Sequence, residues 1–207
     1  AGVRYGNRFR AAGSRARGGS VWRPNPDRQE RAMYPVTLTG RVVTLREFRE
    51  DDAADVHAII GDDRVTGYLS FDSRTPAQAE TMIAEVIERS AQAPRTEYYL
   101  AITLSDDRLI GFARLALGGV KAAKIGYAVR ADRWGGGYAT DAARVLIAFA
   151  FNRLGLHRVT AAIGPDNVGS LAVASKVGME YEGRLRDHVF TNNAWRDSLL
   201  YSIISRS

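Results

Sequence analysis

The sequence predicts an α/β (α+β) fold built around a mixed, mostly antiparallel sheet. Two observations carry this prediction. Three strand patterns follow one another in the middle of the chain, separated by the turn pairs Asp106-Asp107 and Gly118-Gly119, as in an antiparallel meander. Before and after this meander, helical patterns alternate with strand patterns, as crossover connections require.

The first part of the chain contains one strand pattern and two helical patterns. Residues 42–48 alternate apolar and polar side chains, as a half-buried strand does. Asp51 and Asp52 place negative charge at the positive end of a helix that Gly61 ends. A second helix begins at Thr75-Pro76, because proline suits the first helical turn. Its apolar positions recur at helical spacing: Ala79, Met82, Ile83, Val86 and Ile87.

The rest of the chain predicts six more strands and two more helices. A long helix is expected from Ala139 to Leu154, with Gly155 as its C-terminal cap. Asn167 caps a shorter helix that runs to about Val177. Asn192-Asn193 is a typical hairpin turn between the last two strands. The expected strands span 98–104, 109–117, 123–130, 158–163, 181–190 and 195–204.

Composition excludes several classes of protein. The 207 residues are 45% hydrophobic and 25% charged, which suits a soluble domain with a sizeable core. The absence of cysteine excludes disulfides, thiolate metal sites and a cysteine nucleophile. The longest apolar run, Val145 to Phe151, is far shorter than the ~20 residues that span a bilayer. No signal-peptide pattern opens the sequence, so we expect a cytoplasmic protein without a membrane partner.

The net charge of +6 belongs to the first 32 residues alone. They hold eight arginines against Asp27 and Glu30, with no leucine or isoleucine. Such a segment cannot bury enough apolar surface to offset its ordering entropy, so residues 1–32 are predicted to be a flexible basic extension before a domain of residues 33–207. The extension is either an arm that binds RNA or the ribosome, or a tag remnant or upstream extension of the reading frame. Met33 favours the second interpretation.

Three consecutive glycines lie where a predicted strand gives way to the long helix. Gly135, Gly136 and Gly137 let the backbone approach a ligand closely, and the helix start adds unpaired N–H groups with partial positive charge. Together these features make a cradle for a pyrophosphate. Thr140 stands where a dinucleotide fingerprint needs its third glycine, and no P-loop sequence is present. From spacing alone, a simple glycine-rich turn is an equally good interpretation.

The glycine segment resembles the coenzyme A loop of the GCN5-related N-acetyltransferases (GNAT), whose motif is Gln/Arg-x-x-Gly-x-Gly/Ala. Here Trp134 replaces the first residue, while Gly137 and Ala139 match the others, as in the RimJ/RimL subgroup of ribosomal-protein N-terminal acetyltransferases. The likeness extends from about residue 34 to 204. It implies a seven-stranded sheet with helices on both faces and with splayed central parallel strands. Further matching segments are 156–159, 167–170, 176–179, 182–187 and 195–197.

The resemblance also implies acetyl-CoA as co-substrate and a set of residues that bind it. Backbone groups at Ala128 and Val129 would hold the pantetheine arm, and an N–H there would polarise the thioester carbonyl. Asn167 would contact the pantetheine, with Ser170 beside it. The expected pyrophosphate loop comprises Trp134, Gly135, Gly136, Gly137, Tyr138, Ala139 and Thr140.

The resemblance identifies the proton donor less directly. Many family members carry a tyrosine near the leaving thiolate, and the matching position here is Ala174. RimL-like members use a serine instead, which Ser170 matches. A hydroxyl there could stabilise or protonate the thiolate, so a catalytic Ser170 is favoured slightly over a serine that only opens its helix.

The general base of the family is missing from its usual position. Lys124 stands where many members carry a glutamate, and Val189 where RimL-like members do. Asp187 lies two residues before Val189, hence on the same face of a regular strand, and is the expected substitute. By the same alternation, His188 is expected to point to the other face as a packed or surface imidazole.

The apparent weakness of the base bears on the acceptor. At pH 7 an α-amine with a pKa of ~7.7–8.0 is roughly a tenth neutral, whereas a lysine is neutral in only about 1 part in 2,000. An α-amine of a peptide or protein N-terminus is therefore the favoured acceptor. Tyr68 and Phe71, in the loop that lines the family's acceptor pocket, are expected to contact it, although a core role is equally open.

Alternatives remain at this stage. One is a small-molecule or antibiotic acetyltransferase, or the use of another acyl group. Another is a ribosome- or RNA-binding protein that acts through residues 1–32 and keeps a CoA-responsive domain. The three histidines have no metal-ligand spacing, so no metal is expected. Without cysteine, direct transfer in a ternary complex is favoured over an acyl-enzyme. Both a monomer and a homodimer are open.

Overall fold

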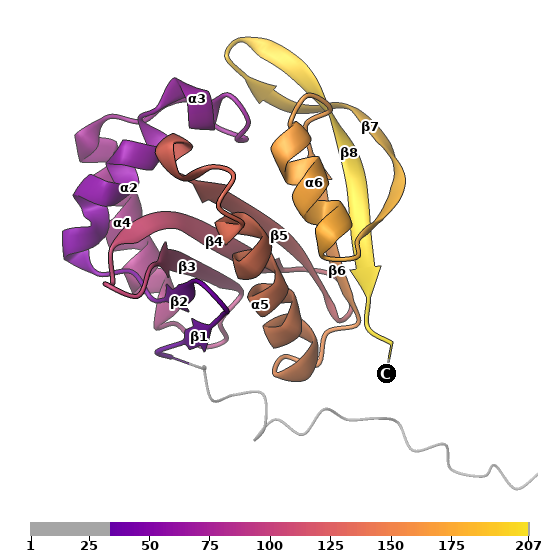
Figure 1. Ribbon diagram of the computed structural model, residues 1–207, viewed down its shortest axis with the longest axis horizontal. Coiled ribbons are helices and arrows are strands. Elements are labelled where there is room, and N and C mark those ends of the chain that lie inside the picture. The colour runs from indigo at the N-terminus through magenta and orange to yellow at the C-terminus, as the bar shows by residue number, and fades with distance from the viewer. Residues whose placement is uncertain (1–33, 207) are drawn as a thin grey trace, which may run out of the picture.

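The computed structural model describes residues 34–206, which form one eight-stranded sheet with helices on both faces (Figure 1). The strand order is β1-β2-β3-β4-β5-β6-β8-β7, and only β5 and β6 are paired in parallel. The strands are β1 (Thr37–Thr39), β2 (Thr44–Arg46), β3 (Glu97–Thr103), β4 (Leu109–Leu117), β5 (Ala122–Val129), β6 (Arg158–Ile163), β7 (Glu180–Thr191) and β8 (Ala194–Ile204).

The mixed, mostly antiparallel sheet predicted from the sequence is confirmed, with one strand more than the seven expected. The additional strand is β1, an edge strand that pairs with β2 through three residues. It was missed because Leu38, between two threonines, is its only apolar side chain, so three residues cannot establish an alternating pattern.

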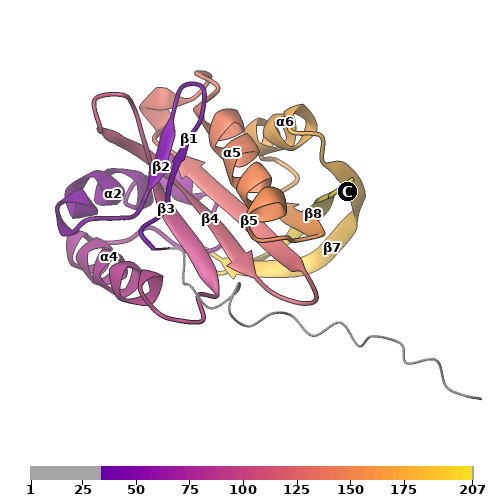
Figure 2. The same cartoon turned by 90° about the horizontal axis from the view of Figure 1, so that it is seen from below.

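The helices divide between the two faces of the sheet. Helices α2 (Ala53–Ile60) and α4 (Pro76–Ser90) cover one face, with the single turn α3 (Asp63–Thr66) beside them (Figure 2). Helices α5 (Tyr138–Asn152) and α6 (Val168–Lys176) cover the other. The predicted start of α4 is confirmed by a reciprocal capping box between Thr75 and Gln78.

Each face has its own apolar core. On the α5 side, fully buried strand residues such as Leu100 and Leu115 pack with Leu146. On the other side, Val56 of α2 and Ile83 of α4 are fully buried with neighbours on β3 and β4. The sheet is therefore the shared layer of two cores, and a break in it opens a passage between the two faces.

Such a break lies between the two parallel strands. β5 and β6 pair only at three positions, the last being Lys124 with Thr160. Beyond these, β5 continues to pair with β4 up to Val129, and β6 with β8 up to Ile163. The two halves of the sheet therefore diverge toward the carboxyl ends of both strands, which confirms the expected splay (Figure 1).

Asp141 holds the start of α5 against the first hairpin. This carboxylate is 5% exposed and accepts hydrogen bonds from the backbone N–H groups of Val42 (2.8 Å) and Val43 (3.2 Å). A β-carbon at Gly40 would lie 2.4 Å from the carboxylate oxygen, so only glycine fits there. The β1–β2 turn thus fixes the helix that follows the three glycines.

No helix within residues 34–206 is long and apolar enough to cross a membrane. The basic extension predicted for residues 1–32 lies outside the described residues, and its binding of RNA or the ribosome stays a prediction.

Replacing Asp141 with alanine should destabilise the domain. The change leaves the Val42 and Val43 N–H groups without their acceptor, and hydrogen bonds to a charged group contribute about 1.5–3 kcal/mol each. We expect the free energy of unfolding in urea to fall by about 2–3 kcal/mol. Glu88→Ala, an exposed change on α4, should cost less than about 0.5 kcal/mol. Equal losses in the two variants would refute the anchoring role of Asp141.

Candidate active site

The break between β5 and β6 opens into a cavity of about 1040 Å³. Its walls come from eight parts of the chain: β3, β4, β5, β6, the start of α6, the loop of residues 67–71, helix α4 and the end of the β7–β8 hairpin. The cavity thus lies where the chain brings distant segments together at the carboxyl ends of two parallel strands, a common position for ligand sites in such sheets.

The α6 side of the cavity presents two hydroxyl groups. Ser170 lines the cavity in the first turn of α6, where its backbone N–H donates to Asn167 Oδ1 at 3.0 Å. Tyr127 lines it from β5 and donates its hydroxyl to the Ser170 carbonyl at 3.4 Å. Burial raises the pKa of Tyr127 to about 12, so the phenol keeps its proton at any physiological pH. Sequence reasoning missed Tyr127 because it reads as an ordinary strand residue.

The glycine loop lies beyond the cavity, at the carboxyl end of β5. Gly135 and Gly137 have φ angles of +83° and +78°, and no atom lies within 4 Å of a β-carbon built on either. Gly137 is the N-cap of α5, and no side chain caps that helix. The first N–H groups of α5 therefore face an open, glycine-lined surface, which fits a pyrophosphate.

Backbone groups on β5 also fit the predicted pantetheine arm. Ala128 and Val129 pair with β4 on one edge, but their other edge has no β6 partner because the strands have parted. Trp134 closes part of that edge, since its indole Nε1 donates to the Val129 carbonyl at 2.8 Å. Trp134, which stands where the family motif has Gln or Arg, thus links the glycine loop to the end of β5 through this hydrogen bond.

The predicted cofactor residues consequently fall into two groups. Asn167 and Ser170 line the cavity. The remaining ones, Ala128, Val129 and residues 134–140, form a continuous rim from the end of β5 to the start of α5. An elongated ligand could follow that rim and place one end in the cavity.

The loop of residues 67–71 forms the opposite wall. Tyr68 and Phe71, both predicted to contact the acceptor, line the cavity. Phe71 also packs against the α2–α4 core, which confirms its core role, whereas its contact with an acceptor stays a prediction. The ring of Tyr68 lies 6.3 Å from that of Trp134, between centroids, which brings this loop beside the glycine loop.

Arg196 ties this wall to the β7–β8 hairpin. Its guanidinium donates to the carbonyls of Gly67 and Leu69. A second link runs from the Asn192 N–H to the carboxylate of Asp72 at 2.9 Å. Two segments more than 100 residues apart are thereby joined across the cavity.

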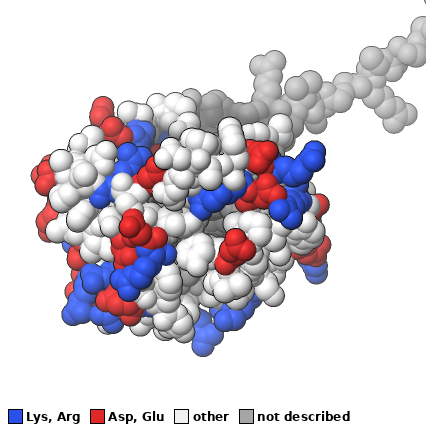
Figure 3. Space-filling model, turned by 90° about the horizontal axis from the view of Figure 1, so that it is seen from above, with Lys and Arg blue, Asp and Glu red and all other residues white. Residues whose placement is uncertain are grey.

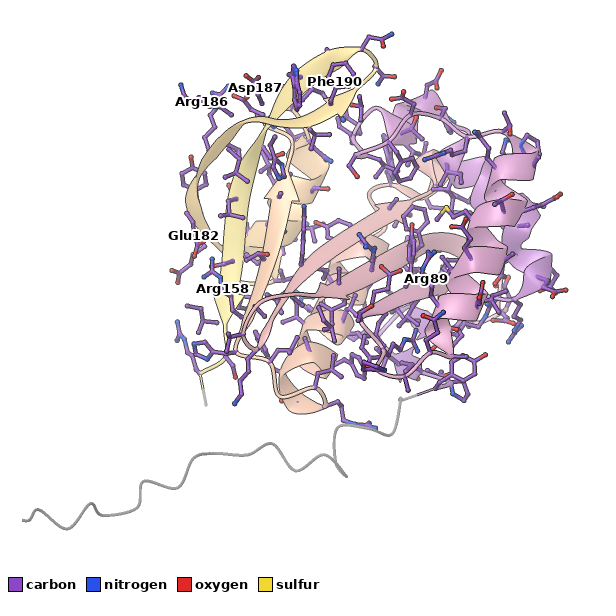
Figure 4. The ribbon with its side chains drawn as sticks, turned by 180° about the vertical axis from the view of Figure 1, so that it is seen from behind. Arg89, Arg158, Glu182, Arg186, Asp187 and Phe190 are labelled. Atoms are coloured by element: carbon purple, nitrogen blue, oxygen red, sulfur yellow. The ribbon has the colours of Figure 1, made fainter. Side chains whose placement is uncertain are left out.

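The expected placement of Asp187 is wrong. Between Leu185 and Val189 the pairing of β7 with β8 shifts, and Asp187 has a φ of +46°, so a bulge interrupts the alternation of side chains. Asp187 lies at the outer edge of β7 (Figure 4) and does not line the large cavity. Its N–H donates to Asp197 Oδ1 at 2.8 Å, which stabilises the bulge.

The same bulge brings His188 into the cavity wall, where sequence alternation had not placed it. The Nδ1 atom of His188 lies 2.9 Å from the hydroxyl oxygen of Ser198 on β8. Partial burial and the positive charge of Lys124 lower the pKa of His188 below its usual value near 6.5, so the imidazole is neutral at pH 7. The signal in the sequence was the histidine itself, but the bulge that orients it was not readable.

The charges around the cavity are mostly neutralised by one another. Three of its four acidic residues form ion pairs with arginines: Glu85 with Arg89, Glu97 with Arg89 and Arg114, and Asp197 with Arg184. Lys124 has no carboxylate partner among residues 34–206, and Arg74 lies over the ring of Phe71. Figure 3 shows acidic and basic side chains interspersed on the face that carries α3 and the hairpin tip. No cluster of metal-ligating side chains occurs within residues 34–206.

Residues 43–180 match the family model described as an acetyltransferase (GNAT) domain. The chain belongs to the GNAT family. The enzyme is accordingly an N-acetyltransferase, and it has the fold that the resemblance predicts.

Two curated relatives come from Bacillus subtilis. The uncharacterized N-acetyltransferase YoaA is 28% identical over 176 residues, which cover 83% of this chain and 98% of YoaA. YjcK, named as a probable N-acetyltransferase, is 39% identical over 113 residues, which cover 53% of this chain and 62% of YjcK.

Two solved structures illustrate how broad the likeness is. RimJ of Mycobacterium smegmatis, in complex with CoA-disulfide, is 29% identical with a TM-score of 0.74, over 83% of this chain and 88% of that one. Spermidine N-acetyltransferase from Vibrio cholerae, in complex with CoA and spermine, has a TM-score of 0.68 over 78% of this chain and 95% of that one. At 18% identity, the second likeness concerns the fold alone.

Replacing Arg196 with alanine should loosen the cavity wall that the loop of residues 67–71 forms. The backbone N–H groups of Tyr68 and Leu69 donate to the carbonyls of Val65 and Thr66 in α3, and their hydrogen exchange reports the opening of the loop of residues 67–71. Because charged hydrogen bonds contribute about 1.5–3 kcal/mol each, exchange of these two amides should accelerate by about tenfold or more. Arg186→Ala, on the outer edge of the same hairpin, is the matched control and should leave their exchange unchanged (Figure 4). Unchanged exchange in Arg196→Ala would refute the link.

Proposed function

We propose that this N-acetyltransferase moves acetyl from acetyl-CoA to the α-amine of a peptide or protein N-terminus, by direct transfer in a ternary complex. The observation that carries the proposal is the splay between β5 and β6, because it joins the glycine loop on one side of the sheet to a large cavity on the other. A thioester at the splay and an amine in the cavity would meet there.

The rim from Ala128 to Thr140 supports the binding of acetyl-CoA along one side. The open N–H groups at the start of α5 would bind the pyrophosphate, and the glycine loop would admit it without a steric clash. The unpaired edge of β5 would hydrogen-bond the pantetheine, and an N–H there would polarise the thioester carbonyl. Acetyl-CoA supplies an activated acyl group on a thiolate leaving group.

Ser170 is the proposed donor to that leaving thiolate. It lines the cavity from the first turn of α6, where the helix N-terminus also favours negative charge. The protonated hydroxyl of Tyr127 lies against the Ser170 carbonyl and keeps this part of the wall polar. Since the sequence has no cysteine, the acyl group would pass straight to the amine.

The charges of the cavity support a single primary amine over a polyamine as the acceptor. A polycation needs free carboxylates, whereas Glu85, Glu97 and Asp197 are already paired with arginines. Lys124 and Arg74 add positive charge to the lining of the cavity. A peptide fits the open mouth between the loop of residues 67–71 and the β7–β8 hairpin. The similar RimJ structure, which is in complex with CoA-disulfide, supports a CoA thioester as the second substrate.

Binding of acetyl-CoA can be tested with two matched glycine variants. Gly137→Asp places a carboxylate at the start of α5, so we expect the affinity for acetyl-CoA in calorimetric titration to fall by about tenfold or more. Gly119 has a similar φ of +74° but lies in the β4–β5 turn, so Gly119→Asp carries the same backbone strain without the charge effect. Equal affinities in the two variants would contradict the assignment of the glycine loop.

The acceptor class can be tested with a panel of amines. With saturating acetyl-CoA, we expect kcat/KM for peptides with free N-termini to exceed that for spermidine and for Nα-blocked lysine peptides by about tenfold or more. Preference for a small amine or for spermidine would overturn the N-terminal assignment. Deleting residues 1–32 should leave acetyl transfer to a short peptide unchanged, whereas a loss confined to RNA or ribosome binding would assign that role to the extension.

A further inference from the structure

We infer that His188 is the general base of acetyl transfer, held in position by Ser198. The inference rests on the proposed function, since it concerns the amine that enters the same cavity. It replaces the carboxylate bases that the resemblance led us to seek, because neither Lys124 nor Val189 can accept a proton there and Asp187 lies on the outer edge of β7.

The bulge in β7 places His188 in the wall of the cavity. Leu185 pairs with Ser198 and Val189 with Arg196, so three residues of β7 stand opposite Asp197 alone. The surplus is accommodated by the left-handed backbone of Asp187, which turns its side chain outward and leaves His188 in the cavity wall. Bulges often re-aim side chains next to active sites.

The imidazole of His188 contacts the hydroxyl of Ser198. Ser198 is 3% exposed and lies on β8 next to Asp197, where it pairs with Leu185. Its hydroxyl oxygen is 2.9 Å from His188 Nδ1. When Nδ1–H donates to this hydroxyl, the lone pair of the imidazole is on Nε2, the atom free to meet an acceptor amine. Ser198 thus acts as a positioning residue that holds the ring, and the inference requires the tautomer with its proton on Nδ1.

Partial burial and the positive charge of Lys124 lower the pKa of His188, which keeps the imidazole neutral at pH 7. Lys124 approaches from β5 with its positive charge, and Arg196 lies on β8 with its guanidinium bound to the acceptor loop. On the neighbouring strands, Arg184 and Asp197 neutralise each other. Asp166, before α6, and Arg74, beyond the loop of residues 67–71, line the same cavity. No carboxylate among residues 34–206 forms an ion pair with the imidazole of His188.

In the proposed step, the amine nitrogen bonds to the thioester carbonyl carbon, and the bond from that carbon to sulfur breaks. The nitrogen gives one proton to Nε2 of His188 as its bond to carbon forms. CoA leaves as the thiolate, with Ser170 donating a hydrogen bond to it, and takes a proton from solvent. The imidazolium then releases its proton to solvent through the open mouth of the cavity.

The pH dependence of kcat is the principal test, with a peptide acceptor. Both a neutral amine and a neutral imidazole are required, so log kcat of the wild-type enzyme should approach a slope of two at pH values below the pKa of His188. His188→Gln should lower kcat by about 100-fold or more at pH 7.5 and reduce that slope to one. His57→Gln, on α2 and outside the cavity, should match the wild type. A slope of two retained in His188→Gln would overturn the inference.

Chemical rescue provides a second test. Added imidazole should restore part of the activity of His188→Ala, in proportion to the neutral imidazole present, and should leave Ser170→Ala unaffected. Ser198→Ala should lower kcat less than His188→Gln does and retain the slope of two, as a positioning residue would. If imidazole gives no rescue and His188→Ala raises only the KM for the acceptor while kcat stays unchanged, His188 binds the acceptor and is not the base.

A spectroscopic readout does not depend on activity. In nitrogen NMR of the free protein, His188 should titrate below the usual histidine value near 6.5 and should carry its proton on Nδ1 when neutral. The opposite tautomer would overturn the inference. If the wild-type protein transfers acetyl to no amine while this tautomer is observed, the proposed function fails and the orientation of His188 stands.

Discussion

The short parallel pairing between β5 and β6 is the constraint on which the site depends. Three residue pairs join the two halves of the sheet, and each strand then follows its antiparallel neighbour, β4 on one side and β8 on the other. Unpaired backbone edges in a protein interior are costly unless something satisfies them. Trp134 satisfies one such group, the Val129 carbonyl, and the rest form the ready-made hydrogen-bonding edge of a ligand site.

The polar network around this opening explains how a divided sheet can hold a defined geometry. Asp141 fixes the start of α5 to the β1–β2 turn, so the glycine loop is anchored at its downstream end. Arg158 and Ser202 meet Glu182 across β6, β8 and β7, which fastens the other half-sheet (Figure 4). Arg196 then bridges the two walls of the cavity. Rigid strands thus carry the site, while loops close it.

The sequence predicted the parts of the structure that local rules govern. Helix α4 follows from Thr75, Pro76 and helical spacing, and the turn into α5 follows from glycines placed between a strand and a helix. Strand β1 was not predicted because its three residues are too few to show an alternating pattern. Tyr127 escaped because its position in the cavity depends on where β6 parts from β5, which is set by pairing between strands more than 30 residues apart.

The error over Asp187 and His188 shows most clearly why a site cannot be read from strand periodicity alone. Alternation assumes one residue per partner residue, and it assigned the carboxylate to the cavity side. The bulge breaks that assumption, since the Asp187 N–H binds the carboxylate of Asp197 in place of a regular ladder contact. That N–H and Arg184 both lower the pKa of Asp197, so it stays ionised and the bulge persists near neutral pH. This local hydrogen bond stabilises the bulge that leaves His188, and not the adjacent Asp187, in the wall of the cavity.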